Sequence, residues 1–222
     1  MLEKIRVTPE KINRKREIVY CISWIIVGLV LGVFAKYAGV IVQGSSFRNF
    51  IFQVGNMLSS FSLWILLGVV ISIYSQKSIT AAVNVALFFF AMLLSYYLYS
   101  AWIVDYLAPQ VVIGWSIVAV LSSIAGYFTW YAKNDSHIKS GIVRILGLAI
   151  SIAPIAFLIT TMIPTYRIYR QEGLIGIPFA VALIFMLQKG AKERFIVAGI
   201  SIVVGVFLGI IGVIEFVFGS IL

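Results

Sequence analysis

The amino-acid sequence predicts an all-α protein, a polytopic transmembrane helical bundle of about seven spans. Of its 222 residues, 62% are hydrophobic and only 11% are charged, whereas a soluble domain is about 45–50% apolar and ~25% charged. The apolar residues form continuous runs that do not alternate with polar ones, which favours helices over a membrane β-barrel. Charged residues gather in the short connections between the runs.

Seven apolar segments divide the chain. They are Ile18–Tyr37, Phe50–Tyr74, Ile79–Val104, Val111–Tyr131, Ile142–Ile163, Leu174–Gln188 and Phe195–Phe218. The first follows a basic stretch, as a signal peptide does, but it is longer than the ~7–15 residues of a signal h-region and lacks a small-x-small cleavage site. We therefore expect residues 1–17 to form a basic, interfacial segment in the cytoplasm and residues 18–222 to form a single transmembrane domain.

The sixth segment, Leu174–Gln188, is the shortest. At ~1.5 Å per residue it is about 22 Å long, against a hydrocarbon core of ~30 Å. Gly173, Gly176 and Pro178 lie near its beginning. Short segments interrupted by glycine or proline are typical of transport sites.

Lysine and arginine set the predicted orientation. With the N-terminus in the cytoplasm, 13 of the 17 basic residues lie on the inner side and four on the outer side, as the positive-inside rule requires. Seven spans then place the C-terminus outside. The outer four are Lys36, Arg48, Arg167 and Arg170.

The residue types disfavour several classes of function. The single histidine, His137, belongs to a predicted loop, and no HExxH motif, paired carboxylates or Walker lysine occurs. We therefore expect neither an enzyme nor a metal or other cofactor. The formal charge of +9 is explained by the basic inner loops, which face anionic lipid, so we expect no nucleic-acid partner.

Polar residues inside the spans are the best signal of a site, because each needs a partner away from lipid. On the third segment, Tyr99 continues a helical stripe through Ala91 and Ser95, with Tyr96 beside it, whereas Tyr97 is expected to face lipid. The predicted ligand-binding residues are all in the outer half: Gln53, Asn56 and Ser60 on one face of the second segment, Tyr96 and Tyr99 on the third, Thr160 on the fifth, and Arg167 and Glu172 before the sixth.

Two interpretations of these residues stay open. They form an outward-facing polar pocket, or they are interhelical hydrogen-bonding groups and an aromatic belt at the outer interface, where tyrosine and tryptophan rings settle.

Four stretches resemble a family of small polytopic bacterial membrane proteins with a domain of unknown function. They are Gly28–Tyr37, Leu63–Ser75, Ala81–Asn84 and Phe88–Tyr99. The resemblance covers about the first 135 residues and ends near Trp130–Lys133. It implies a multi-pass protein of the bacterial cytoplasmic membrane and no activity.

Two functions remain in view. The first is binding or transport of a small solute through the outward-facing pocket. The helix directions also allow a parallel repeat, with three spans on either side of a linking span, as in small sugar transporters. The second is an accessory, immunity or assembly subunit that packs its helices against a partner membrane protein. The expected partners are therefore the lipid bilayer, a small-molecule solute and a partner membrane protein.

Overall fold

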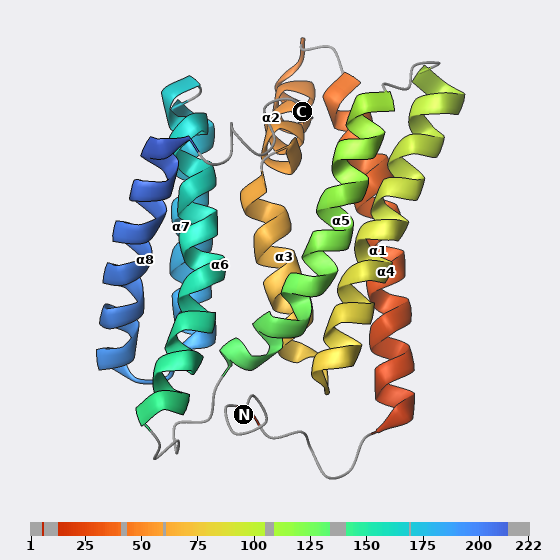
Figure 1. Ribbon diagram of the computed structural model, residues 1–222. Coiled ribbons are helices and arrows are strands. Elements are labelled where there is room, and N and C mark those ends of the chain that lie inside the picture. The colour runs from red at the N-terminus through yellow and green to blue at the C-terminus, as the bar shows by residue number, and fades with distance from the viewer. Residues whose placement is uncertain are drawn as a thin grey trace.

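The computed structural model describes residue 6 and residues 13–40, 44–59, 61–104, 109–133, 141–168 and 170–212. Within these ranges the chain is helical, without strands (Figure 1). The elements are α1 (Arg14–Val40), α2 (Ser46–Ser59), α3 (Phe61–Tyr74), α4 (Ser78–Tyr99), the π-helix η2 (Ser100–Val104), α5 (Pro109–Thr129), the 3-10 turn η3 (Trp130–Ala132), α6 (Gly141–Ile168), α7 (Arg170–Leu187) and α8 (Ala191–Ile211).

The prediction of an all-helical membrane protein is confirmed. Five helical stretches are long and apolar enough to cross a bilayer: Arg14–Val40, Ser78–Ile103, Val112–Ala132, Ile145–Ile163 and Ala191–Ile211. They correspond to the first, third, fourth, fifth and seventh predicted segments. The other two segments supply shorter apolar helices, Phe61–Tyr74 and Gly176–Leu187. Of the predicted N-terminal segment 1–17, only Arg6 and residues 13–17 lie within the described residues, and α1 begins four residues before Ile18.

The second predicted segment is divided into two helices, α2 and α3. The two helices lie on either side of residue 60, which is outside the described residues. The buried Trp64 donates its indole N–H to the Leu58 carbonyl oxygen at 2.8 Å. That bond satisfies a carbonyl that the end of α2 leaves without a helical partner, and it ties α2 to α3.

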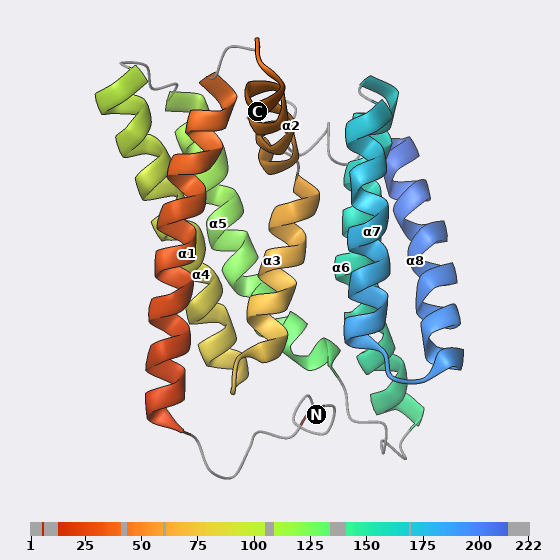
Figure 2. The same cartoon turned by 180° about the vertical axis from the view of Figure 1, so that it is seen from behind.

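The helices form two groups with α3 between them. Helices α1, α4 and α5 lie on one side of α3 and helices α6, α7 and α8 on the other, as both views show (Figures 1 and 2). Helix α3 contributes Trp64 and Ile71 to a core shared with α2 and α4. It contributes Val69 and Ile73 to a second core shared with α6, α7 and α8. Burial on both of its sides therefore joins the two groups.

Glycines allow α4 to lie close to α1. A Cβ added at Gly28 would be 2.5 Å from the Phe88 carbonyl oxygen, and one at Gly32 would overlap the Met92 carbonyl and the Ser95 side chain. Both glycines are buried. In a membrane, van der Waals packing replaces the hydrophobic effect between helices, so small residues at such contacts bring backbones together.

The other group repeats this device. A Cβ at Gly205 of α8 would be 2.7 Å from the Ala156 carbonyl oxygen of α6, and one at Gly209 would be 2.6 Å from Ile163. In each group, therefore, two helices meet through a pair of glycines. These are α1 with α4, the first and third predicted spans, and α6 with α8, the fifth and seventh.

The two ends of the bundle differ in chemistry. The end that holds Arg6 and the beginning of α1, called the basic end below, also carries Lys77, Lys133 and Lys189 in its connections (Figure 1). The opposite end, called the aromatic end below, is where α4 finishes with Tyr96, Tyr97, Tyr99 and Trp102. Helices α1, α4, α6 and α8 run from the basic end to the aromatic end, and α3, α5 and α7 run back.

Gly32→Val should destabilise the fold, because the added side chain has no room between α1 and α4. We expect a loss of about 1–3 kcal/mol, the usual cost of overpacking, seen as a lower melting temperature of the detergent-purified protein. Gly39→Ala is the matched control on the same helix, because nothing lies within 4 Å of a Cβ there. Equal melting temperatures for Gly32→Val and the wild type would contradict the close α1–α4 contact.

Candidate functional site

A cavity of about 280 Å³ lies at the aromatic end, where α1 and α4 separate above their glycine contact. Five helices supply its walls. The lining residues are Ala35, Lys36, Gly39 and Val40 of α1, Leu58 of α2, Trp64 of α3, Met92, Leu93, Tyr96 and Tyr97 of α4, and Trp115 of α5. Its volume lies just below the ~300–1,000 Å³ of pockets for drug-sized ligands, so the cavity suits a smaller molecule.

Lys36 is the charged group of the cavity. Its ammonium nitrogen lies 5.4 Å from the centre of the Tyr96 ring, within the ~6 Å reach of a cation–π contact. Among the described residues, no carboxylate pairs with Lys36. An ammonium group that is partly buried among aromatic rings gains most from an anion, since the surroundings screen charge poorly.

The other aromatic rings are held in place by contacts between elements. The Tyr97 hydroxyl donates to the Val112 carbonyl oxygen of α5 at 3.3 Å. The Tyr96 and Tyr97 rings meet edge to face with centroids 5.6 Å apart, and Trp115 stacks on Phe61 at 5.1 Å. The cavity is therefore preformed, with walls that need little ordering when a ligand enters.

Ser100, the first residue after α4, carries a buried hydroxyl and is not among the residues that line the cavity. Its side chain is 1% exposed, and its Oγ has no hydrogen-bond partner within the described structure. Ser100 follows Leu93, Tyr96 and Tyr97 by seven, four and three residues, which places it on the same helical face. A buried hydroxyl without a partner costs free energy, so this position is stabilised by any ligand that bonds to it.

The helix changes its hydrogen-bonding pattern at the same place. Residues Ser100–Val104 form the π-helix η2. Single π-helical turns inside α-helices are rare and frequent at functional sites. The change of pitch therefore begins at Ser100, three residues after Tyr97, the last residue of α4 that lines the cavity.

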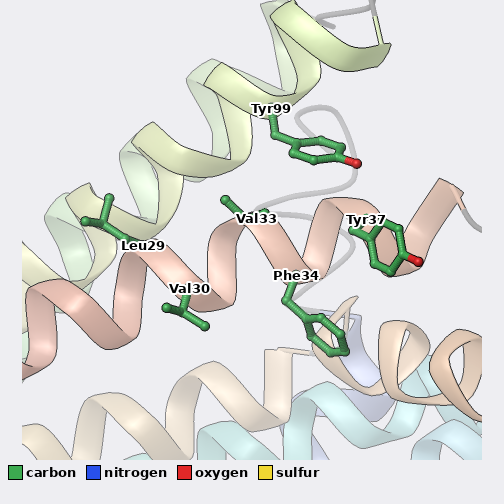
Figure 3. A pocket seen from close by; sticks show the side chains of 6 residues that line it. All are labelled: Leu29, Val30, Val33, Phe34, Tyr37 and Tyr99. Carbon is green, nitrogen blue, oxygen red and sulfur yellow. The ribbon is translucent and has the colours of Figure 1, made fainter.

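A second hollow lies on the outer surface of the same helix pair. It is an apolar groove of about 520 Å³ lined by Leu29, Val30, Val33, Phe34, Tyr37 and Tyr99. Figure 3 shows the Tyr99 ring extending from α4 toward α1 and lying opposite Val33 and Tyr37. The groove carries no charged side chain and opens to the surface.

The structure places the three tyrosines in different surroundings. Tyr96 lines the cavity, and its role in binding a ligand stays a prediction. Tyr97 was expected to face lipid, but it lines the cavity and packs against the core of α2, α3 and α4. Tyr99 does follow the stripe of Ala91 and Ser95 toward α1, but that stripe opens on the apolar groove. The spacing of residues along α4 does not show that α5 covers the face of α4 that carries Tyr97.

The remaining predicted residues do not gather in the cavity. Gln53 lies on the exposed side of α2, because α2 turns Ile51, Gly55 and Leu58 inward instead. Thr160 is buried, donates to the Ala156 carbonyl oxygen at 2.8 Å and lies 3.2 Å from that of Gly205. It therefore joins α6 to α8, away from the cavity.

Some predicted residues lie outside what the structure describes. They are Ser60 and the side chains of Asn56, Arg167 and Glu172. The backbones of Arg167 and Glu172 belong to the end of α6 and the beginning of α7, at the aromatic end.

Two cavity residues, Lys36 and Trp115, were missed from the sequence. Lys36 was used only in counting charges for the topology, and Trp115 belongs to an otherwise apolar run. The signal that could have found Lys36 is its position in the last turns of an apolar helix, directly before the aromatic Tyr37.

No protein-family model, curated protein or solved structure matches this chain. Within the described residues, no group of three or more His, Cys, Asp or Glu side chains comes together that could hold a metal ion. The inference of function therefore depends on the cavity itself.

Tyr97→Phe should lower stability, because it removes the hydrogen bond to α5. Hydrogen bonds between membrane helices average ~0.6 kcal/mol and reach ~1.7, so we expect a small decrease in melting temperature. Tyr99→Phe, whose ring lies in the open groove, should melt like the wild type. A larger effect of Tyr99→Phe than of Tyr97→Phe would contradict the assignment of these two side chains.

Proposed function

We propose that the protein binds a small amphipathic anion in the cavity at the aromatic end and carries it across the bacterial cytoplasmic membrane. The observation that carries this proposal is the position of the Lys36 ammonium in an aromatic-walled cavity, 5.4 Å from the centre of the Tyr96 ring. A ligand with a carboxylate and an apolar body would pair with Lys36 and fill the space between the rings.

The proposed topology has seven spans with the basic end in the cytoplasm. Helices α2 and α3 together form the second span and α7 forms the sixth, which fits the alternating directions of the helices (Figure 1). The excess of lysine and arginine supports this orientation. The cavity then faces the outside.

The matching glycine contacts support transport over static binding. The α1–α4 contact joins the first span to the third and the α6–α8 contact joins the fifth to the seventh, with the glycines on α1 in one pair and on α8 in the other. Transporters built from repeated groups of helices alternate access by moving one group against the other, and here α3 lies between the group of α1, α4 and α5 and the group of α6, α7 and α8 (Figure 2).

Ligand binding can be tested with phenylacetate and its neutral amide as probes, by isothermal titration calorimetry of the protein in nanodiscs. We expect phenylacetate to bind and phenylacetamide to bind at least tenfold more weakly. Lys36→Met should weaken phenylacetate binding roughly ten- to hundredfold, because a hydrogen bond to a charged group contributes ~1.5–3 kcal/mol. Lys192→Met, an exposed lysine at the basic end, is the control.

Equal binding of the acid and the amide, or equal losses in the two lysine variants, would reject Lys36 as the anion site. If phenylacetate binds as expected, a second measurement separates transport from binding alone. Labelled phenylacetate should enter proteoliposomes that contain the wild type and should not enter those that contain Lys36→Met.

The orientation can be tested with single cysteines at two exposed positions, Ser45 and Lys192, after Cys21→Ser. In intact cells a membrane-impermeant maleimide should label Ser45→Cys at once and Lys192→Cys only after the membrane is opened. The reverse pattern would place the basic end outside.

A second candidate function is packing against a partner membrane protein, and the apolar groove between α1 and α4 favours it. The groove would receive the aliphatic side chains of one transmembrane helix of the partner. Val30→Trp should fill the groove and release a stoichiometric partner isolated from native membranes. Val203→Trp, on the exposed face of α8, should retain it.

A further inference from the structure

Four parts of the chain meet at the basic end. They are Arg6, the end of α3, the turn η3 after α5, and the end of α7. Ile73 of α3, Ala132 of η3 and Leu187 of α7 belong to one buried cluster, so the residues that follow each of them lie close together. This meeting place is distinct from the cavity, which is at the opposite end.

Arg6 is held firmly in this place. Its guanidinium group donates to the Trp130 carbonyl oxygen at 2.7 Å and to the Ile73 carbonyl oxygen at 2.9 Å. It also lies 4.2 Å from the centre of the Trp130 ring. Trp130 is itself fixed, because its indole N–H donates to the Ser75 carbonyl oxygen at 2.8 Å. The positive charge of Arg6 is therefore part of the folded structure.

Two lysines bring further positive charge to the same place. The Lys133 ammonium lies 4.7 Å from the centre of the Tyr74 ring, one residue from the Ile73 carbonyl that binds Arg6. Burial lowers the pKa of Lys133, and the charges of Arg6 and Lys189 lower it further. Positive charge from Arg6 and from the exposed Lys189 therefore acts on the partly buried Lys133 ammonium, and an anion bound beside Lys133 would stabilise its charged form.

Gln188 supplies the second, independent observation. Its side chain is 2% exposed, and its Nε2 has no hydrogen-bond partner within the described structure. Its backbone carbonyl oxygen accepts a bond from the Arg194 Nε at 2.9 Å, which fixes the residue between α7 and α8. A buried amide N–H group without an acceptor is costly and rare, and here it follows directly after Leu187 of the shared cluster.

We propose that the basic end binds the phosphate group of an anionic molecule between α3, η3 and α7, with Arg6, Lys133 and Lys189 supplying the charge and Gln188 Nε2 donating a hydrogen bond. A phosphate has several acceptor oxygens and one or two negative charges, so one group satisfies both the cations and the amide. A lipid headgroup and a free phosphate share this chemistry. A headgroup fits the location, since basic pockets between helix ends bind anionic lipids.

The test uses the full chain in neutral detergent, with two probes: mixed micelles of phosphatidylcholine with and without phosphatidylglycerol, and inorganic phosphate. The readout is the rate at which Lys133 reacts with an acylating reagent as a function of pH, followed by peptide mass spectrometry. We expect a phosphate probe to slow acylation and to raise the pH at which Lys133 becomes reactive, because an anion stabilises the charged amine.

Variants assign the effect to the site. Gln188→Leu keeps the side chain buried and removes the hydrogen-bond donor. We expect it to lower the affinity for the phosphate probe roughly tenfold or more, while the protein without a probe stays folded. Lys189→Met should do the same. Lys192→Met, an exposed lysine at the same end, should leave the affinity unchanged. Protection by phosphatidylglycerol alone would identify a headgroup, and protection by inorganic phosphate would identify a free phosphate.

Two outcomes would overturn the proposal. One is a Lys133 acylation profile that neither probe changes. The other is equal weakening by Lys192→Met and Lys189→Met with no effect of Gln188→Leu, which would indicate attraction to a charged surface without a site. Neither outcome bears on phenylacetate binding at the aromatic end, so the two proposals fail separately.

Discussion

The glycine contact between α1 and α4 is the constraint on which the site depends. Gly28 and Gly32 let the backbones of α1 and α4 touch at mid-height, and the two helices diverge from there toward the aromatic end (Figures 1 and 2). The separation leaves the cavity on the inner side, where α2, α3 and α5 close it, and the apolar groove on the outer side (Figure 3). Side chains larger than hydrogen at these two positions would hold the helices apart at mid-height and change both spaces.

Satisfaction of buried polar groups explains most of the other contacts. Away from water, an unpaired donor or acceptor costs more than a hydrogen bond gains. Asn84 accordingly donates to the Ser75 hydroxyl at 3.0 Å, and Thr160 donates to a backbone carbonyl where α6 meets α8. Among the described residues, five side chains depart from this rule: Glu17, Trp24, Ser100, Gln188 and Ser201. Of these, Gln188 lies at the basic end directly before Lys189, where the phosphate site is proposed.

Helix α3 links the two ends. Its first turns carry Trp64, which lines the cavity and ties α2 in place. Its last turn supplies the Ile73 carbonyl oxygen that binds Arg6 and the Tyr74 ring beneath Lys133. Because α3 is buried against both groups of helices, a displacement of one group against the other would shift α3, and with it residues at both the cavity and the basic end.

The sequence alone determined the class of protein, because long apolar runs in lipid must satisfy their backbone groups within helices, and it located each run within a few residues. Composition could not predict which residues of the second run belong to α2 and which to α3, or which face of each helix is covered. Those depend on neighbours distant in sequence: α5 covers Tyr97, α8 accepts Thr160, and α2 turns Gln53 outward. Lys36 entered the sequence argument only as a charge count. Tertiary structure alone placed it beside Tyr96, because side-chain surroundings are set by how helices cross.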